Sequence, residues 1–197
     1  IASDINEGPV NRAKINVAVS GLSKKITVMK ADGLDEAAKL SPDDIIIAGM
    51  GGELIRDIID ASEYVKKPSI RLILQPMTMP EVLREYLAVN GFEIVEERVC
   101  VAADKCYQII CAHFDGKKRE FDLVTLLLGE KNIERMKASP TEDDTEMLRR
   151  TVAAVERRIN GRKMSQTPDV CAIKSDEELV AFCKKLLSGN GDKNANG

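Results

Sequence analysis

The chain has 197 residues, of which 44% are hydrophobic and 31% are charged, and its formal net charge is −3. A chain of this length can bury one core and carry a small appendage. It contains no apolar run long enough to span a membrane, and its negative net charge argues against a protein that coats nucleic acid uniformly.

The first half of the chain predicts strands and helices in strict alternation. Strands are expected at residues 1–4, 25–33, 43–49 and 70–76. Helices are expected at residues 8–21, 34–40, 52–65 and 80–91, the last of them capped by Thr78. Because these strands are short and almost wholly apolar, they are typical of a parallel sheet that is covered on both faces.

Two consecutive strands then break the alternation. They are expected at residues 92–102 and 105–114 and are joined only by Ala103 and Asp104. This spacing predicts a hairpin whose last strand is antiparallel to its neighbour. An alternating α/β sheet that ends in one antiparallel hairpin is the order of the Rossmann-like class I methyltransferase fold. A plain dinucleotide-binding domain has less need of such an ending.

The remainder of the chain predicts helices. Residues 120–140 are ambiguous but fit a helix that breaks near Gly129. Residues 140–163 predict a helix with acids at its start and bases at its end, which complements the helix dipole. A last helix is expected at residues 175–189, with Ser175 as its cap.

A change of composition near Gly116 divides the chain in this interpretation. We expect a methyltransferase-like domain over residues 1–115 and a helical, coiled-coil-like extension over residues 116–188. The polar residues 189–197 are expected to form a disordered tail.

The ends of three predicted strands carry residues that suit a nucleoside. Ligands of open α/β sheets bind outside the carboxyl ends of the strands. Asp4 ends the first strand, where a carboxylate can accept hydrogen bonds from both hydroxyls of a ribose. Asp32 ends the second and can accept from an adenine amino group, with Gly33 leaving room for the ring. The glycine-rich segment 48–52 follows the third and lets a ligand approach the main chain. Together they favour an adenosyl cofactor.

Two other interpretations of the glycine-rich segment compete with this one. A nicotinamide fingerprint needs glycine at position 54 and an acid after the next strand, but the chain has Leu54 and Gln75 there, so a nucleotide-dependent oxidoreductase is disfavoured. A tight turn that binds no ligand stays open as the plain structural alternative.

Cysteine and histidine usage bears on metals and on the compartment. None of the five cysteines forms a C-x-x-C pair, and His113 is the single histidine, so no metal site is expected. An odd number of cysteines without a visible secretion signal indicates reduced thiols in a cytoplasm.

Basic residues gather near the end of the helix predicted at 140–163. Against Glu156 alone, residues 147–163 hold Arg149, Arg150, Arg157, Arg158, Arg162 and Lys163. A second cluster comprises Lys117, Lys118 and Arg119. Both could neutralise phosphates of an RNA, and a solvated basic helix end is the alternative.

Several stretches together carry a family resemblance. These are "IASDINEGPVNRAKINV", "KKITVMKADGL", "IIIAGMGGELIRDII", "RLILQPM" and "DKCYQII", within residues 1–114. They resemble the bacterial tRNA adenine-N1 methyltransferases that modify adenine-22. The resemblance implies an enzyme that uses S-adenosyl-L-methionine, acts on tRNA, and has a class I methyltransferase domain followed by a helical extension.

Carried over by position, the resemblance implies site residues. Asp4 matches the acid on the cofactor ribose, and Asp32 with Gly33 matches the contacts to the adenine ring. Ala48, Gly49, Met50 and Gly51 match the motif beside the methionine part and the target base, and Gln75 with Pro76 matches the motif after the next strand. The resemblance therefore makes Gly49, Met50, Gly51, Gln75 and Pro76 the candidates on the substrate side. Met77 departs from the family pattern, in which many members have Asn at this place.

The front of the chain also departs from the family, which begins with a helix and a strand that carries an Asp-x-Gly-x-Asp-His-type loop. None of this is visible before Asp4, so we expect an N-terminally truncated chain that lacks a strand between those ending at Asp4 and Gly49, with weak or absent cofactor binding. A non-catalytic RNA-binding or scaffold protein on a decayed methyltransferase fold is the alternative function.

Overall fold

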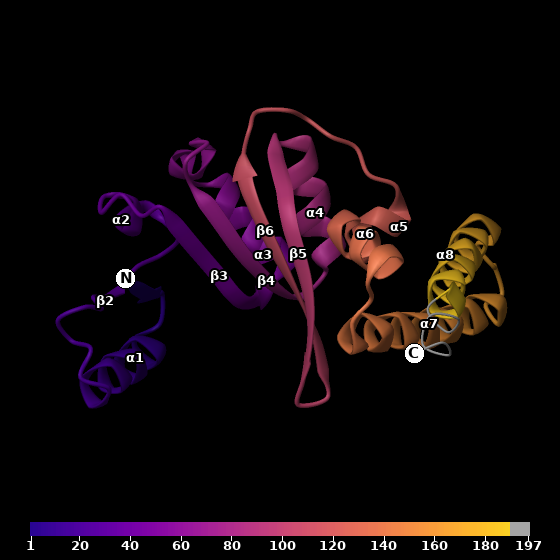
Figure 1. Cartoon of the computed structure of the whole chain (residues 1–197), viewed down its shortest axis with the longest axis horizontal. Helices are drawn as coiled ribbons and strands as arrows, with labels where there is room; N and C mark the ends of the chain where they lie inside the picture. Colours follow the sequence, from indigo (N-terminus) through magenta and orange to yellow (C-terminus); the bar gives the residue numbers. More distant parts are fainter. Residues whose placement is uncertain (190–197) are drawn as a thin grey trace.

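The computed structural model describes residues 1–189. Figure 1 shows three parts in a row: an N-terminal part, a central sheet and a C-terminal group of helices. The N-terminal part consists of β1 (Ala2–Asp4), α1 (Glu7–Val19), β2 (Val28–Lys30) and α2 (Asp35–Ala38). The central part consists of β3 (Asp44–Gly51), α3 (Gly52–Asp60), η1 (Glu63–Lys66), β4 (Arg71–Thr78), α4 (Pro80–Val89), β5 (Phe92–Ala102) and β6 (Lys105–Phe114). The C-terminal part consists of α5 (Leu123–Leu128), α6 (Glu130–Ala138), α7 (Glu142–Lys163) and α8 (Val170–Gly189).

The central sheet has the order β3-β4-β6-β5. β3 and β4 are parallel, whereas β6 is antiparallel to both β4 and β5. Ala103 and Asp104 join β5 to β6 with φ values of 46° and 60°, as a two-residue hairpin turn of the primed type requires. The predicted hairpin and the antiparallel last strand are therefore confirmed.

The N-terminal strands form a separate parallel sheet. Ala2 to Asp4 pair with Val28 to Lys30, and α1 packs on both strands. Over residues 1–189, neither β1 nor β2 is hydrogen-bonded to the central sheet. β2 is also much shorter than the strand predicted at residues 25–33, because the segment before it is taken up by backbone turns that follow α1.

One face of the central sheet is covered by α3 and α4, which lie behind it in Figure 1. On that side Ile47, Leu74 and Ile110 are buried. Along β3 burial alternates, so Ile46 points the other way and is 69% exposed. The prediction that helices cover both faces of the sheet is therefore wrong: within residues 1–189, the face that carries Ile46 is open.

The C-terminal helices form a second core. It includes Leu128, Met136, Leu148 and Leu179, and Val99 of β5 belongs to it as well. The predicted break at Gly129 is confirmed, since this residue separates α5 from α6 with φ at 89°. Thr141 and Asp144 form a capping box at the start of α7.

The starts of two helices differ from prediction. α8 begins at Val170, because Asp169 accepts a hydrogen bond from the Ala172 N–H, and Ser175 lies inside the helix with its hydroxyl on the Cys171 carbonyl. Thr78 does not cap α4. The N-cap position, immediately before Pro80, is occupied by Met79, whose backbone is in the left-handed region.

The remaining differences concern helix ends. The helix predicted at residues 52–65 ends at Asp60, and a 3₁₀ turn from Glu63 follows it. Of the predicted tail only Gly189, the last residue of α8, falls within the described residues. Over residues 1–189, no helix has both the length and the apolar character that crossing a membrane requires.

Candidate functional site

A β-bulge shapes the glycine-rich end of β3. Ala48 pairs with Gln75 and Met50 with Pro76, so Gly49 is an extra residue between them. Its φ of 79° lies in the region that glycine adopts without strain. The Gly49 N–H, which the bulge removes from regular pairing, donates to Gln75 Oε1 at 3.0 Å. The structure thus brings the predicted residues of β3 and β4 together.

The space at Gly49 is open. A Cβ atom built there would meet no atom within 4 Å. At Gly52 the same atom would collide with the Met79 carbonyl oxygen, so that glycine is required for close packing of α3 against the start of α4. The two glycines therefore serve different purposes, and of these two only Gly49 presents bare backbone to the outside.

The Gln75 amide is fully engaged beside this turn. Its Nε2 donates to the Pro76 carbonyl at 3.1 Å and contacts the Met77 sulfur at 3.4 Å. Both ends of the amide are therefore held, and Gln75 supports the bulge rather than projecting from it. Met77 is 42% exposed beside it.

The predicted aspartates lie together at the end of the N-terminal sheet. The Asp4 carbonyl accepts from the Ala31 N–H at 3.1 Å, which places Asp4 beside the residue that precedes Asp32. Asp4 Oδ1 accepts from the Asn6 N–H at 2.8 Å, and the Asp32 side chain is exposed. Gly33 has φ at 65° and open space around it.

These residues form two groups, one on each sheet. Leu34, which follows Gly33, packs against the core of the central sheet, as does Met50 beside the bulge. The first group offers carboxylate acceptors and the second offers accessible backbone, which are the kinds of group that bind an adenosyl cofactor. The residues present fit such a cofactor.

Most of the basic side chains predicted to contact RNA are paired within the protein. Arg158 and Arg162 both bind Asp176, whose side chain is 3% exposed. These two ion pairs fasten α7 to α8.

Two further cations of α7 are also engaged. Lys163 pairs with Glu177 at 2.7 Å. Arg150 pairs with Glu146 at 2.7 Å and donates to the Asp104 carbonyl at 2.6 Å.

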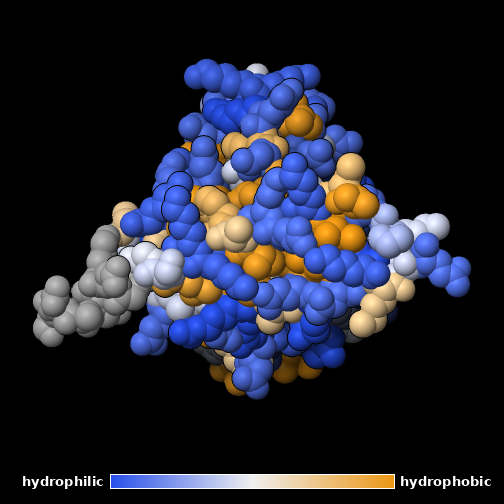
Figure 2. Space-filling view, turned by 90° about the vertical axis from the view of Figure 1, so that its right-hand side faces the viewer, coloured by the Kyte–Doolittle hydropathy of each residue, from blue (hydrophilic) through white to orange (hydrophobic). Residues whose placement is uncertain are grey.

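Arg149 and Arg157 remain as the α7 arginines for which residues 1–189 supply no carboxylate partner, and both are exposed. Figure 2 looks onto the side of the molecule where α7 and α8 lie, and much of that surface is hydrophilic. In the second basic cluster, Arg119 is paired with Asp115 at 2.6 Å, and Lys117 and Lys118 are exposed. Fewer basic side chains are therefore available to bind phosphate than the sequence alone suggests.

Three of the five cysteines are unsuited to nucleophilic chemistry. Burial raises the pKa of the Cys183 thiol to about 11 and also raises the pKa values of Cys106 and Cys111. Such thiols are protonated at neutral pH and unreactive. In the part of the chain that the structure describes, no three Asp, Glu, His or Cys residues converge as metal ligands would.

The prediction of site residues missed a buried ion pair between Arg84 of α4 and Glu97 of β5. A weak signal was present in the sequence, because Arg84 stands between Leu83 and Leu87 on the apolar side of its helix.

The chain matches a family model described as tRNA (adenine(22)-N(1))-methyltransferase over residues 1–175. The tRNA (adenine(22)-N(1))-methyltransferase of Bacillus subtilis (strain 168) is 36% identical over 129 residues, which make up 66% of this chain and 54% of that protein. The chain therefore spans about half the length of this curated relative.

Solved structures agree with this match. A putative tRNA (m1A22) methyltransferase from Streptococcus pneumoniae superposes with a TM-score of 0.75 at 27% identity, covering 94% of this chain and 80% of that one. The same protein in complex with S-adenosyl-L-methionine gives a TM-score of 0.73 at 25% identity, covering 94% and 79% of the two chains. The similarity extends over the sheets and the helices after them.

Proposed function

The chain belongs to the tRNA (adenine(22)-N(1))-methyltransferase family, and from this we propose that it transfers a methyl group from S-adenosyl-L-methionine to N1 of an adenine in tRNA. The observation that carries this proposal is the bulge at Gly49, where a strand end presents open backbone on the central sheet. A cytoplasmic location is part of the proposal, because tRNA is modified there.

We assign the cofactor to the two groups of residues at the strand ends. S-adenosyl-L-methionine supplies, when bound, an electrophilic methyl group on a positively charged sulfur. Asp4 and Asp32 provide carboxylates for the ribose hydroxyls and the adenine amino group, with Gly33 leaving room for the ring. The backbone from Ala48 to Met50 would hold the methionine part.

Methyl transfer to adenine N1 depends mainly on how the enzyme positions the base and the cofactor. This nitrogen has a lone pair in the plane of the ring and carries no proton, so no residue has to act as a general base. In-line placement of N1 and the methyl group is the chief requirement. N1 is paired in a duplex, so the target base must first be unpaired or turned outward.

The segment from Gly49 to Gly51, with Pro76 on β4, is our candidate for the surface that receives the base. The methylated ring is a cation, and backbone carbonyls near its amino group would stabilise the developing charge. Gln75 is assigned a supporting role, because its amide holds the Gly49 N–H and the Pro76 carbonyl.

We assign tRNA contact to residues 116–188 and cofactor chemistry to residues 1–115. Arg149 and Arg157 are the α7 side chains best placed to meet phosphate, because their charges are not offset by a carboxylate within residues 1–189. Arg150, Arg158 and Arg162 hold the fold first and would contribute to the field around the helix rather than to direct contacts.

Three measurements on the full chain test this function. Calorimetric titration at high protein concentration should detect weak binding of S-adenosylhomocysteine and no binding of NAD. Methyl transfer from labelled cofactor should be seen with a tRNA that has adenine at position 22 and not with one that has guanine there. Because N1 methylation blocks base pairing, reverse transcription should stop next to the modified base. Binding of NAD alone would refute the proposal, and tRNA binding without methyl transfer would favour the scaffold alternative.

A further inference from the structure

The ion pair between Arg84 and Glu97 is completely buried. Both side chains have 0% exposure, and Arg84 Nε lies 2.7 Å from Glu97 Oε1. Two charges taken out of water carry a desolvation cost that only complete hydrogen bonding offsets. The identity of their other partners therefore shows what the pair holds in place.

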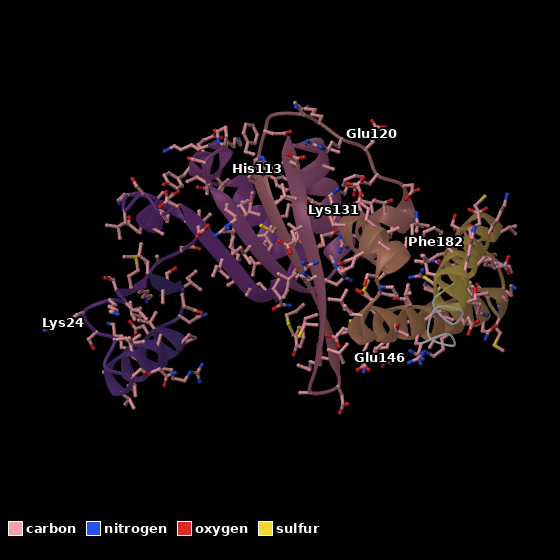
Figure 3. The ribbon with its side chains drawn as sticks, viewed as in Figure 1. Lys24, His113, Glu120, Lys131, Glu146 and Phe182 are labelled. Carbon is pink, nitrogen blue, oxygen red and sulfur yellow. The ribbon has the colours of Figure 1, made fainter. Side chains whose placement is uncertain are left out.

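One of the other partners lies on the sheet, because Arg84 Nη2 donates to Gln108 Oε1 of β6 at 2.5 Å. The rest lie on the corner between α5 and α6. Arg84 Nη1 donates to the carbonyl oxygens of Leu126 at 2.7 Å and Leu127 at 3.3 Å. Glu97 Oε2 accepts from the backbone N–H of Lys131 at 3.0 Å. Lys131 is labelled in Figure 3, at the place where α6 meets the sheet. One charge thus binds the end of α5 and the other binds the start of α6.

Gly129 brings this corner directly onto the carboxylate. A Cβ atom at Gly129 would collide with both Glu97 carboxylate oxygens, and its φ of 89° is one that other residues rarely adopt. If the helical corner moved away, Arg84 Nη1 and Glu97 Oε2 would lose these backbone partners and keep only each other and the sheet. The pair therefore fixes the corner to the sheet in one position.

A bulge in β5 is what turns Glu97 inward. Ile94 pairs with Ala112 and Glu96 with Cys111, so Val95 is an extra residue. Before the bulge Ile94 faces the central core, and after it Glu97 faces the helices instead of Glu96. Without the extra residue, alternation along the strand would place Glu97 on the other face.

The contacts continue to the helix that carries the candidate tRNA arginines. Arg135 of α6 donates to the Glu97 carbonyl at 2.5 Å and forms two hydrogen bonds with Asp144 of α7, at 2.5 and 3.0 Å. Burial alone would raise the pKa of Asp144, but hydrogen bonds from Arg135 and Thr141 outweigh it and hold the pKa below its ordinary value. α7 is thereby tied to β5.

The same ion pair reaches the glycine turn through α4. This helix carries Arg84 and begins after Met79, whose carbonyl oxygen lies against Gly52. A helix of 10 residues is a rigid connection. The bulge at Gly49 and the start of α7 are thus linked by helices and charge-assisted hydrogen bonds.

We propose that Arg84 and Glu97 are positioning residues that hold the helical extension at a fixed orientation to the sheet, and that this orientation sets the affinity for tRNA but not for the cofactor. The tRNA part rests on the proposed function. Neither residue touches the strand ends assigned to the cofactor. Mutating them should therefore weaken tRNA binding and leave cofactor binding unchanged.

The test uses the double variant R84M/E97Q in the full chain. Removing both charges together avoids an unpaired buried charge, and the amide oxygen introduced by E97Q can still accept from the Lys131 N–H, so the variant should fold. The matched control is D44N/R71M, which removes an exposed pair joining β3 to β4, with side chains 48% and 58% exposed. Melting temperature, S-adenosylhomocysteine affinity, tRNA affinity and amide hydrogen exchange are measured for all three proteins.

We expect R84M/E97Q to bind S-adenosylhomocysteine within twofold of the wild type and tRNA at least tenfold more weakly. Amide exchange over residues 123–138 should accelerate at least tenfold without ligand, while exchange in β3 and β4 stays unchanged. The control should match the wild type throughout. Unchanged exchange over residues 123–138, or parallel losses of both affinities with melting temperature, would overturn the proposal.

The exchange measurement also separates the two proposals. If the wild type binds neither S-adenosylhomocysteine nor tRNA, the proposed function fails and the positioning role is decided by exchange alone. If the wild type binds both and the double variant binds tRNA equally well, the positioning role fails and the proposed function stands.

Discussion

Replacing Gly49 with alanine should damage ligand binding far more than folding. The added methyl group would enter open space, since no atom lies within 4 Å of its position. The cost to the fold is the left-handed backbone conformation, about 1–2 kcal/mol, partly offset by the lower entropy of the unfolded chain. A net loss of about 1 kcal/mol corresponds to roughly 2–4 °C in melting temperature for a protein of this size.

Gly52→Ala is the matched variant, three residues away at the first position of α3. Its methyl group would collide with the Met79 carbonyl oxygen, which belongs to the backbone and cannot rotate aside. α3 or the start of α4 must then shift, at a cost of about 3 kcal/mol. This variant should lose stability first and ligand affinity only in consequence.

The assay combines urea denaturation with calorimetric titration of S-adenosylhomocysteine. For Gly49→Ala we expect binding at least tenfold weaker, a loss of about 1.4 kcal/mol in binding free energy. If this variant binds as tightly as the wild type, Gly49 does not lie against the cofactor. Greater destabilisation by Gly49→Ala than by Gly52→Ala would refute the packing argument.

Three further outcomes are expected. Replacing Arg149 and Arg157 with glutamine should reduce the slope of log affinity for tRNA against log salt concentration by about 2, because two phosphate contacts are lost, and an unchanged slope would place the RNA elsewhere. Since the folded-state pKa of Asp144 is lowered, its stabilising contribution is present above the unfolded value of about 3.9 and is lost as pH falls through the folded value. Asp144→Asn should therefore lower the melting temperature at pH 7 and have little effect on it below the folded-state pKa. A loss of melting temperature that is the same at every pH would contradict this. Iodoacetamide at pH 8 should label the exposed Cys171 within minutes and the buried Cys183 only in denaturant, and mass spectrometry of the labelled peptides decides the matter.

Local signals in the sequence predicted the parts of the fold that depend on neighbouring residues. The Ala103-Asp104 turn, the break at Gly129 and the helix over residues 140–163 were all predicted. A turn was expected at the glycine-rich segment 48–52, but β3 continues through it to Gly51, and Gly49 forms a bulge within the strand.

Interactions between distant residues could not be predicted in the same way. Asp176 takes up the charges of Arg158 and Arg162, which precede it by 18 and 14 residues, so the count of basic residues in α7 overstated the charge available to RNA. The partnership of Arg84 with Glu97 depends on the bulge at Val95, and nothing in the local sequence indicates an extra residue within a strand. Ser175 had a good capping pattern, but Asp169 starts the helix earlier.

Because of the bulge at Val95, the single strand β5 contributes side chains to both hydrophobic cores of the molecule. Phe92 and Ile94 belong to the first, and Val99 belongs to the second. A chain severed at Gly116 would keep β5 and lose the helices that shelter its second half, so Val99 and the Glu97 carboxylate would both meet water. The two parts are therefore not interchangeable modules, and any chimaera that exchanges helical arms between relatives has to carry the second half of β5 with them.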